Sequence, residues 1–256
     1  MATWEDTVVP RLLMLTGPSC VGKSPLLAAL RKFYPETAAQ LQPLVLYNDR
    51  TPRPGEQDGV TYHFRPRALL ESLQGEPGYV ALSVRRDLQA LEIAQVQTIL
   101  DAGHDPFFEG NVYIAEALMR APELAEVPKL SCFLSPLSLE EVRFLRAQPH
   151  ADLEKIVTDV MRRKLLLRTQ RQKGILSEVD LQDIEARCGA AYRELQYAPL
   201  FDWVLPNHDG EGTVNWEVAY YPLGDARQCL LVLAAILRGE TPESCWAEHW
   251  PADLFA

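Results

Sequence analysis

The sequence predicts an α/β fold in which helices flank a central parallel sheet. Short apolar runs alternate along the chain with segments of helical periodicity, which is the pattern of parallel strands joined by helices. Residues Gly17 to Ser24 spell GPSCVGKS, a complete phosphate-binding loop, between an apolar run at 11–16 and a helix-forming run at 25–31. With 256 residues, of which 47% are hydrophobic, the chain is long enough for one domain with inserted segments.

The other elements follow from local patterns in chain order. After the first strand and helix, we expect strands at residues 43–47, 61–64, 106–108, 130–134 and 203–205. We expect helices at 67–73, at 88–102 and, with breaks near 148–150 and 173–174, at 138–197. Residues 216–221 alternate like an exposed strand, and residues 225–237 form an apolar helix that should dock on the core.

The phosphate-binding loop predicts a nucleoside triphosphate as ligand. Gly17 and Gly22 permit backbone angles that a side chain would block, so the N–H groups of the loop turn inward around a β-phosphate. Lys23 adds a positive charge near the β- and γ-phosphates, and the Ser24 hydroxyl can ligate Mg²⁺. The following helix directs its positive end towards the same anion. We therefore predict ATP and Mg²⁺ as ligands of the whole loop, which consists of Gly17, Pro18, Ser19, Cys20, Val21, Gly22, Lys23 and Ser24.

Composition and charge narrow the class of protein. A net charge of −10 argues against nucleic acid or an anionic membrane as a partner, because with this excess of acidic residues we expect no predominantly basic surface. The five cysteines are scattered without a C-x-x-C pair, and the sequence has no signal peptide or long apolar span, which favours a cytoplasmic protein. The five histidines are equally dispersed, so a histidine metal site has little support.

A second anion grip is predicted in the loop that follows the second strand. Arg50 and Arg53 lie three residues apart, and Pro52 and Pro54 stiffen the chain around them. Both guanidinium groups can therefore donate to one anion at a reduced cost in entropy, and Glu56 can hold one of them in place. The chain thus offers a site for a second phosphate-bearing molecule.

Positive charge also concentrates at residues 161–164 and 168–173 of the long helical stretch. A charge run alone is usually a solvated helix face. Because a phosphate-binding loop lies upstream, we interpret this stretch as a lid over the phosphates.

The loop at 50–64 resembles the guanylate kinase family. Family members follow the phosphate-binding loop with R-x-P-R-x-G-E-x-x-G-x-x-Y-x-F, which this chain reproduces. The resemblance implies that Arg50, Arg53 and Tyr62 grip the phosphate of an acceptor nucleotide, with Glu56 supporting them. It also implies a P-loop three-layer sandwich at residues 9–240, with an acceptor-binding insert at about 43–96, a helical lid at about 146–180 and a C-terminal tail at 241–256.

Further matches to the family lie downstream. Arg187 lies at a position where the family has an arginine, and this match implies a role at the transition state. Asn207 matches a family asparagine, which implies a contact on the ATP side. Glu109 stands where the family has an aspartate in a strand, and we place it with the acceptor-binding residues. The family's lid is short, whereas this chain has extra residues at 151–166, so we expect a longer helical cover. The predicted catalytic set is Lys23, Arg168, Arg171 and Arg187.

The positions at which the family reads guanine differ in this chain. Leu46 stands in place of a family serine, and Asn48 and Asp49 replace two threonines. The position of a family glutamate falls near Val80, and the position of a family tyrosine run falls at residues 88–91. A site that reads a base by hydrogen bonds discriminates by roughly 10⁴-fold or more, so these replacements should forfeit much of the specificity for guanine. The nearby charged residues either supply replacement contacts or are ordinary surface charges: Arg85, Arg86 and Asp87.

The sequence thus predicts ATP-dependent phosphoryl transfer to a phosphate-bearing acceptor. By the resemblance, the reaction is GMP + ATP = GDP + ADP, catalysed by a nucleoside monophosphate kinase. Three alternatives stay open: a kinase for another nucleotide or a sugar phosphate, a noncatalytic guanylate-kinase-like module that binds proteins, and a nucleotide-dependent switch. The sequence leaves open whether the tail, with Trp246 and Trp250, packs on the body or on another subunit.

Overall fold

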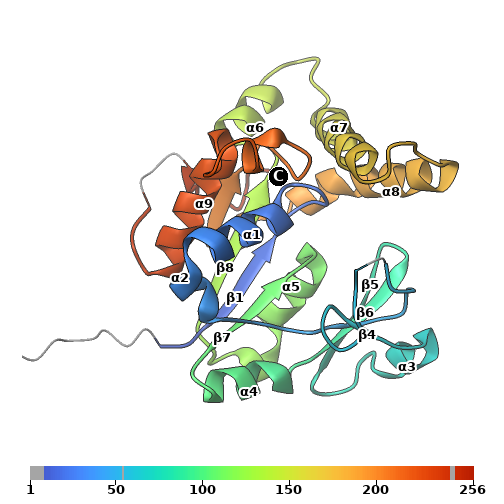
Figure 1. The fold of residues 1–256 in the computed structure, drawn as a ribbon, viewed down its shortest axis with the longest axis vertical. Coiled ribbons are helices and arrows are strands. Elements are labelled where there is room, and N and C mark those ends of the chain that lie inside the picture. Colours follow the sequence, from blue (N-terminus) through green and yellow to red (C-terminus); the bar gives the residue numbers. More distant parts are fainter. Residues whose placement is uncertain (1–8, 54, 243–245) are drawn as a thin grey trace, which may run out of the picture. The chain divides into compact units, whose positions relative to one another are not determined.

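The structure is a computed structural model that describes residues 9–53, 55–242 and 246–256. The chain forms two compact units, whose elements Figure 1 labels. The first contains the chain up to Met14, Gln40–Phe108 and Ala117–Leu130. The second contains Leu15–Ala39, Glu109–Glu116 and Ser131–Ala256.

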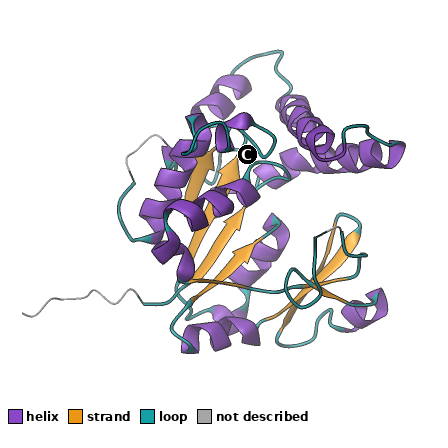
Figure 2. Ribbon diagram, in the orientation of Figure 1, coloured by secondary structure: helices purple, strands orange, loops and turns teal. Residues whose placement is uncertain are grey.

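A five-stranded sheet has the strand order β2-β7-β1-β8-β9. Its strands are β1 (Leu12–Thr16), β2 (Leu41–Pro43), β7 (Asp105–Glu109), β8 (Lys129–Ser135) and β9 (Trp203–Pro206). Figure 2 draws the strands in orange. The β2/β7 and β8/β9 pairs are parallel, and helices separate these strands in the sequence because a parallel pair needs a crossover connection. The predicted α/β fold with a central parallel sheet is confirmed.

Helices α1 (Lys23–Phe33) and α9 (Gly224–Leu237) contribute to the core of the second unit. They pack on each other, and α9 also packs on β9. α1 buries Leu26 and Leu30, and α9 buries seven residues, so the docking predicted for residues 225–237 is confirmed. Shorter helices complete the path of the chain: α2 (Pro35–Ala39), α5 (Val112–Arg120), η1 (Pro122–Leu124) and η2 (Ala198–Leu200).

The charged stretch at 138–197 folds into three helices: α6 (Leu139–Arg146), α7 (Leu153–Lys173) and α8 (Glu178–Leu195). Each begins after a polar side chain that accepts a backbone hydrogen bond, namely Ser138, Asp152 or Ser177. α7 packs along α8 and buries Val157, Met161 and Leu165, which lie one turn apart. The predicted breaks near 148–150 and 173–174 are confirmed, and α7 is a long helix of 21 residues.

The first unit contains a second, four-stranded sheet that the sequence did not predict. Its order is β4-β3-β6-β5, with β3 (Tyr47–Asn48), β4 (His63–Phe64), β5 (Tyr79–Val84) and β6 (Asp87–Glu92). β3 is parallel to β4, whereas the β3/β6 and β5/β6 pairs are antiparallel. Helix α3 (Arg67–Ser72) packs on one face of this sheet, where Leu70, Leu88 and Ala90 form a buried cluster.

The predicted helix at 88–102 is wrong in its first part. Residues Asp87–Glu92 form β6, and helix α4 (Ala94–Asp101) begins only after it. Leu88, Ala90 and Leu91 are buried, and three apolar residues among the six of this segment show no periodicity that separates a buried strand from a helix. The strand forms because a turn at Arg85, whose φ is 58°, folds the chain back onto β5.

Two other expected strands are also corrected. The strand expected at 43–47 is divided between β2 and β3, because the chain passes from one sheet to the other at residues 44–46. The strand expected at 216–221 is a short helix, η3 (Val214–Trp216), followed by turns. The Trp216 indole is buried there and donates to Gly210 O at 2.6 Å, which holds this segment against the neighbouring loop.

The described part of the tail packs on the second unit of its own chain. Glu248 and Val204 exchange two backbone hydrogen bonds of 2.8 Å, so the tail covers strand β9 at the edge of the sheet. The Glu248 carboxylate accepts from Leu139 N and from the Trp250 indole, and Trp250 is only 5% exposed. This docking shields the hydrogen-bonding groups of an edge strand.

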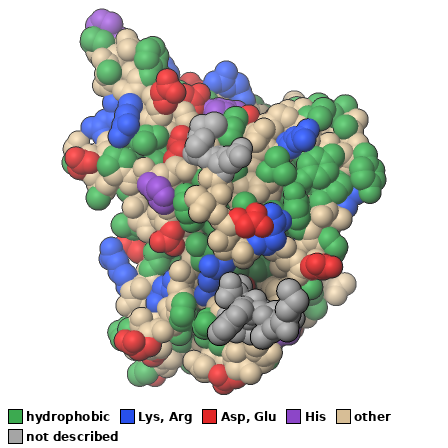
Figure 3. Space-filling model, turned by 90° about the vertical axis from the view of Figure 1, so that its left-hand side faces the viewer, with side chains coloured by type: hydrophobic (Ala, Val, Ile, Leu, Met, Phe, Trp, Pro, Cys, Tyr) green, Lys and Arg blue, Asp and Glu red, His purple; other side chains and the backbone are tan. Residues whose placement is uncertain are grey.

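The surface shown in Figure 3 carries Lys and Arg side chains interspersed with Asp and Glu. Within the described ranges, no helix is both long and apolar enough to cross a membrane. Cys20, Cys132, Cys188 and Cys229 are buried free thiols, whereas Cys245 lies outside the described residues. The cellular compartment stays a prediction.

We predict that Trp250→Ala lowers the free energy of unfolding by about 3–5 kcal/mol, because it leaves a cavity under the docked tail. Urea unfolding followed by circular dichroism measures the change. Trp246→Ala is the matched control, since that indole is only partly buried, and it should cost much less. Equal losses in the two variants would contradict the docking of Trp250.

Candidate active site

The phosphate-binding loop follows β1 and is held in a backbone conformation that requires glycine. Gly17 and Gly22 have φ values of 134° and 116°, in the region that favours glycine. A Cβ atom on Gly17 would lie 2.2 Å from Leu134 O, and one on Gly22 would lie 2.4 Å from the Asn207 amide nitrogen. Both positions therefore exclude a side chain for two independent reasons.

Lys23 and Ser24 begin α1 directly after this loop. Lys23 is 7% exposed, and its ammonium donates to Gly17 O at 2.9 Å and to Pro18 O at 3.1 Å. Ser24 is exposed at the positive end of the α1 dipole. This donor set suits a Mg²⁺–triphosphate complex, in which the phosphates supply the other oxygen ligands of the metal. No cluster of three or more acidic, histidine or cysteine side chains among the described residues could hold a metal by itself.

Helix α7 is fastened to the ATP side by the loop at residues 207–211. Lys164 of α7 donates to Asn207 O at 2.9 Å, and burial lowers the pKa of Lys164 to about 8. Arg168 of α7 pairs with Glu211 at 3.0 Å, and Glu211 N donates to Cys20 O of the phosphate-binding loop. The Arg168 guanidinium is therefore paired within the protein, and its contact with a phosphate stays a prediction.

The other predicted residues of the second unit occupy separate elements. Asn207 is fully buried and donates from its side chain to Val21 O at 2.7 Å, so it supports the phosphate-binding loop. Arg187 lies on α8 and pairs with Asp183 at 2.9 Å, one turn earlier. Arg171 is exposed near the end of α7. The predicted nucleotide contacts of these three residues stay predictions.

Glu109 is the last residue of β7. The protein surrounding its carboxyl raises the pKa of Glu109 by desolvation, and Glu211 adds to the rise, whereas Lys23 and Arg31 act in the opposite direction. Glu109 therefore lies within electrostatic range of Lys23.

The predicted acceptor grip lies in the first unit and contains the expected ion pair. The Arg50 guanidinium donates to both Glu56 oxygens, at 2.6 and 2.5 Å, and lies over the Tyr62 ring with a distance of 5.3 Å to its centroid. Arg53 N donates to Glu56 at 2.7 Å. The hydrogen bonds from Arg50 are the main cause that lowers the pKa of Glu56. Glu56 thus holds the Arg50 guanidinium in place, as the sequence predicted of one arginine, and it also accepts from the Arg53 backbone.

The guanidinium of Arg53 is available for an anion. Arg53 is exposed, and its side chain makes no hydrogen bond or ion pair with any residue in the described ranges. The Arg50 side chain, by contrast, is only 14% exposed. Arg53 therefore supplies the open position of the grip, and Arg50 its anchored one.

Several residues of the site were missed by the sequence. Glu211 and Lys164 contact residues that are 43 positions away, and no spacing motif signals such contacts. Lys164 belongs to the basic segment 161–164, which is the one available signal. His208, next to Asn207, bonds Glu141 and Asp225; burial lowers its pKa, but the two carboxylates outweigh burial and raise it overall.

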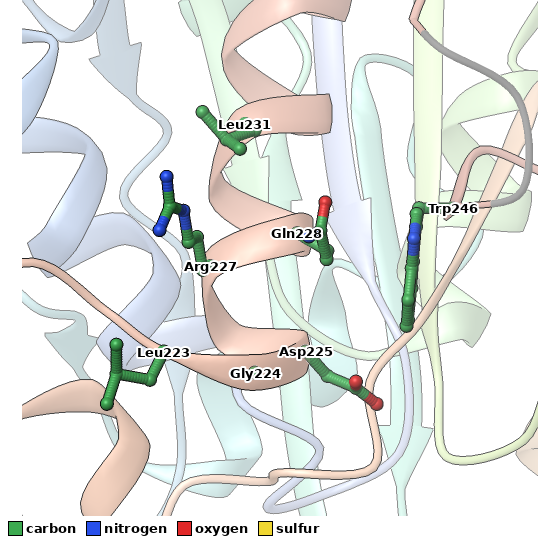
Figure 4. A pocket seen from close by; sticks show the side chains of 7 residues that line it. All are labelled: Leu223, Gly224, Asp225, Arg227, Gln228, Leu231 and Trp246. Carbon is green, nitrogen blue, oxygen red and sulfur yellow. The ribbon is translucent and has the colours of Figure 1, made fainter.

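A cavity of about 420 Å³ lies at the start of α9 (Figure 4). None of the described residues that line it belongs to the predicted site. The lining consists of Leu223, Gly224, Asp225, Arg227, Gln228, Leu231 and Trp246.

We predict that Gly17→Ala abolishes ATP binding and lowers the free energy of unfolding by about 1–3 kcal/mol, because its Cβ would overlap Leu134 O. Calorimetric titration with ATP and urea unfolding measure the two effects. Gly103→Ala is the matched control: its φ is also positive, at 80°, but nothing lies within 4 Å of an added Cβ. Retention of ATP affinity in the Gly17 variant would show that the close approach is not needed.

Comparisons with known proteins agree with this geometry. A guanylate kinase of Synechococcus sp. (strain JA-3-3Ab) is 30% identical over 214 residues, which are 83% of this chain and 82% of that protein. A guanylate kinase of Alkalilimnicola ehrlichii is 28% identical over 205 residues, which cover 79% of this chain and 83% of that protein. A guanylate kinase of Pseudomonas fluorescens is 31% identical over 153 residues, or 59% and 70% of the two chains.

A search against models of protein families gives no match. Among solved structures, guanylate kinase from Anaplasma phagocytophilum superimposes with a TM-score of 0.53 at 18% identity, over 93% of this chain and 90% of that one. This likeness supports the fold. The sequence identity to the Synechococcus protein over more than four fifths of both chains shows that the chain belongs to the guanylate kinase family.

Proposed function

We propose that the protein transfers the γ-phosphoryl group of ATP to the phosphate of GMP, which gives ADP and GDP. The observation that carries this proposal is the joint presence of a complete phosphate-binding loop and an arginine pair organised by one carboxylate. Membership of the guanylate kinase family supports the same reaction.

Phosphoryl transfer asks mainly for positioning and positive charge. The transferred group passes through a loose transition state whose charge lies on its peripheral oxygens. Lys23 and the N–H groups of the loop bind the β- and γ-phosphates, and Arg168, Arg171 and Arg187 add positive charge around them. Mg²⁺, held by the Ser24 hydroxyl when bound, supplies further neutralisation of the phosphates.

The acceptor is held by Arg50, Arg53 and Tyr62, with Glu56 as their support. Closure of the α7 lid over the phosphates excludes water and suppresses hydrolysis of ATP. Glu109 contacts the acceptor, and it is close enough to Lys23 for the charge of the lysine to act on its pKa. Each of these roles is part of the proposal.

The alternative functions predict different results in one screen. A noncatalytic module would have little use for a buried lysine donating within an intact loop, so the intact loop favours an enzyme. ATP consumption measured with nucleoside monophosphates and phosphorylated sugars identifies the acceptor. Turnover with a sugar phosphate and with no nucleotide would replace GMP in the proposal, and no turnover with any acceptor would favour the module.

We predict that Lys23→Ala lowers turnover by at least about 100-fold, since it removes a cation aimed at the transferred charge. Steady-state ADP release measures turnover, and circular dichroism verifies the fold. Lys155→Ala, at an exposed position early in α7, is the matched control and should keep full activity. Unchanged turnover in the Lys23 variant refutes the assignment.

We predict that Arg53→Ala raises the KM for the acceptor by about 10- to 100-fold and lowers kcat, because a charged hydrogen bond contributes about 1.5–3 kcal/mol. The KM for ATP should stay near its original value. Arg238→Ala, which removes an exposed arginine paired with Glu240, controls for the loss of a positive charge. An effect confined to the KM for ATP would show that Arg53 binds ATP and not the acceptor.

A further inference from the structure

Asn48 is a fully buried polar residue of the acceptor-binding unit with an unused donor. Its side chain is 0% exposed, and its amide nitrogen has no hydrogen-bond partner among the described residues. Buried donors are nearly always paired in folded proteins, because an unpaired one loses its hydration without compensation. A donor of this kind next to a binding loop suits an acceptor atom on a ligand.

The orientation of the Asn48 amide is fixed by the chain itself. Arg50 N donates to the side-chain oxygen Oδ1 of Asn48 at 3.1 Å. The NH₂ group is therefore the part of the amide that has no partner. A ligand that meets this group must therefore present a hydrogen-bond acceptor. This requirement distinguishes the nucleobases, since they differ in which groups are donors and which are acceptors.

Asn48 lies on the side of its sheet where a base can follow the gripped phosphate. In the register, Asn48 is opposite Phe64 of β4 and Gln89 of β6, whereas α3 packs on the alternate residues Leu88 and Ala90. The Arg50 guanidinium lies 5.6 Å from the centroid of the Phe64 ring. The predicted phosphate grip and the unused amide therefore neighbour the same aromatic ring.

The spacing along the chain fits a nucleotide. Asn48 and Arg50 are two residues apart, and the chain bends at Arg50, whose N–H donates back to the Asn48 side chain. A ribose can span such a separation between a phosphate and a base. Because the amide is inaccessible to solvent, a base must displace neighbouring side chains to reach it.

We propose that Asn48 is a specificity-determining residue, which donates from its amide to the 6-oxo group of a purine nucleoside monophosphate. The inference rests on the proposed nucleoside monophosphate kinase function and names the acceptor class by its chemistry. Guanine presents O6 and N7, both acceptors, on one edge, and hypoxanthine shares this pattern. Adenine presents an NH₂ donor at position 6, which opposes the Asn48 donor.

The test compares kcat/KM for GMP, IMP and AMP in the wild type and in Asn48→Ala. Loss of one neutral hydrogen bond should lower kcat/KM for GMP and IMP by the same factor, about 3- to 10-fold, and removal of the opposing donor should raise kcat/KM for AMP. Asn48→Ser, which keeps a hydroxyl donor, should retain part of the discrimination and covers the case in which the alanine variant does not fold. Ser83→Ala, an exposed position on β5, is the matched control and should change none of the three values.

The outcomes separate this inference from the function on which it rests. A wild type that phosphorylates GMP, with variants that lose activity equally on all three nucleotides, overturns the role of Asn48 and leaves the kinase function intact. A drop in melting temperature without a change in the GMP to AMP ratio has the same meaning. A wild type that phosphorylates no nucleoside monophosphate overturns both.

Discussion

The close approach of two glycines to their neighbours is the constraint on which the ATP side of the structure depends. Leu134 O and the Asn207 amide occupy the space that side chains at Gly17 and Gly22 would fill. Asn207 also donates to Val21 O, so it both excludes a side chain at Gly22 and holds the loop by a hydrogen bond. Lys164 then donates to the Asn207 backbone, which links the phosphate-binding loop to helix α7 through one residue.

The cations predicted to bind phosphates are already paired within the protein. Lys23 bonds two loop carbonyls, Arg168 bonds Glu211, and Arg50 bonds Glu56. Phosphate binding at these positions is therefore an exchange of partners. The exchange lowers the net affinity of each contact, but it keeps the cations oriented in a protein of net charge −10. Arg53 differs, because its exposed guanidinium can meet an anion without giving up a partner.

The sequence predicted those parts of the molecule in which local chemistry and fold need the same residues. The phosphate-binding loop needs Gly17 and Gly22 both for its backbone angles and for its ligand, and Glu56 serves arginines that lie within six positions of it. The four-stranded sheet was missed because the apolar residues of β6 have no period that distinguishes a strand from a helix. The contacts of Glu211 and Lys164 were missed because long-range pairs follow from the packing of α7, which no local pattern encodes.

In the proposed acceptor site, one residue joins the two tasks of binding and selection. The Arg50 side chain grips a phosphate, which every nucleotide carries, and the Arg50 backbone N–H fixes the orientation of the Asn48 amide. Charged contacts to the phosphate supply most of the affinity, whereas a single neutral donor contributes only modestly to it. The donor still decides between bases, because a base with the wrong group opposite it leaves two donors facing each other in a buried site. Selectivity in such a site depends on the unfavourable pairing of the wrong substrate more than on tight binding of the right one.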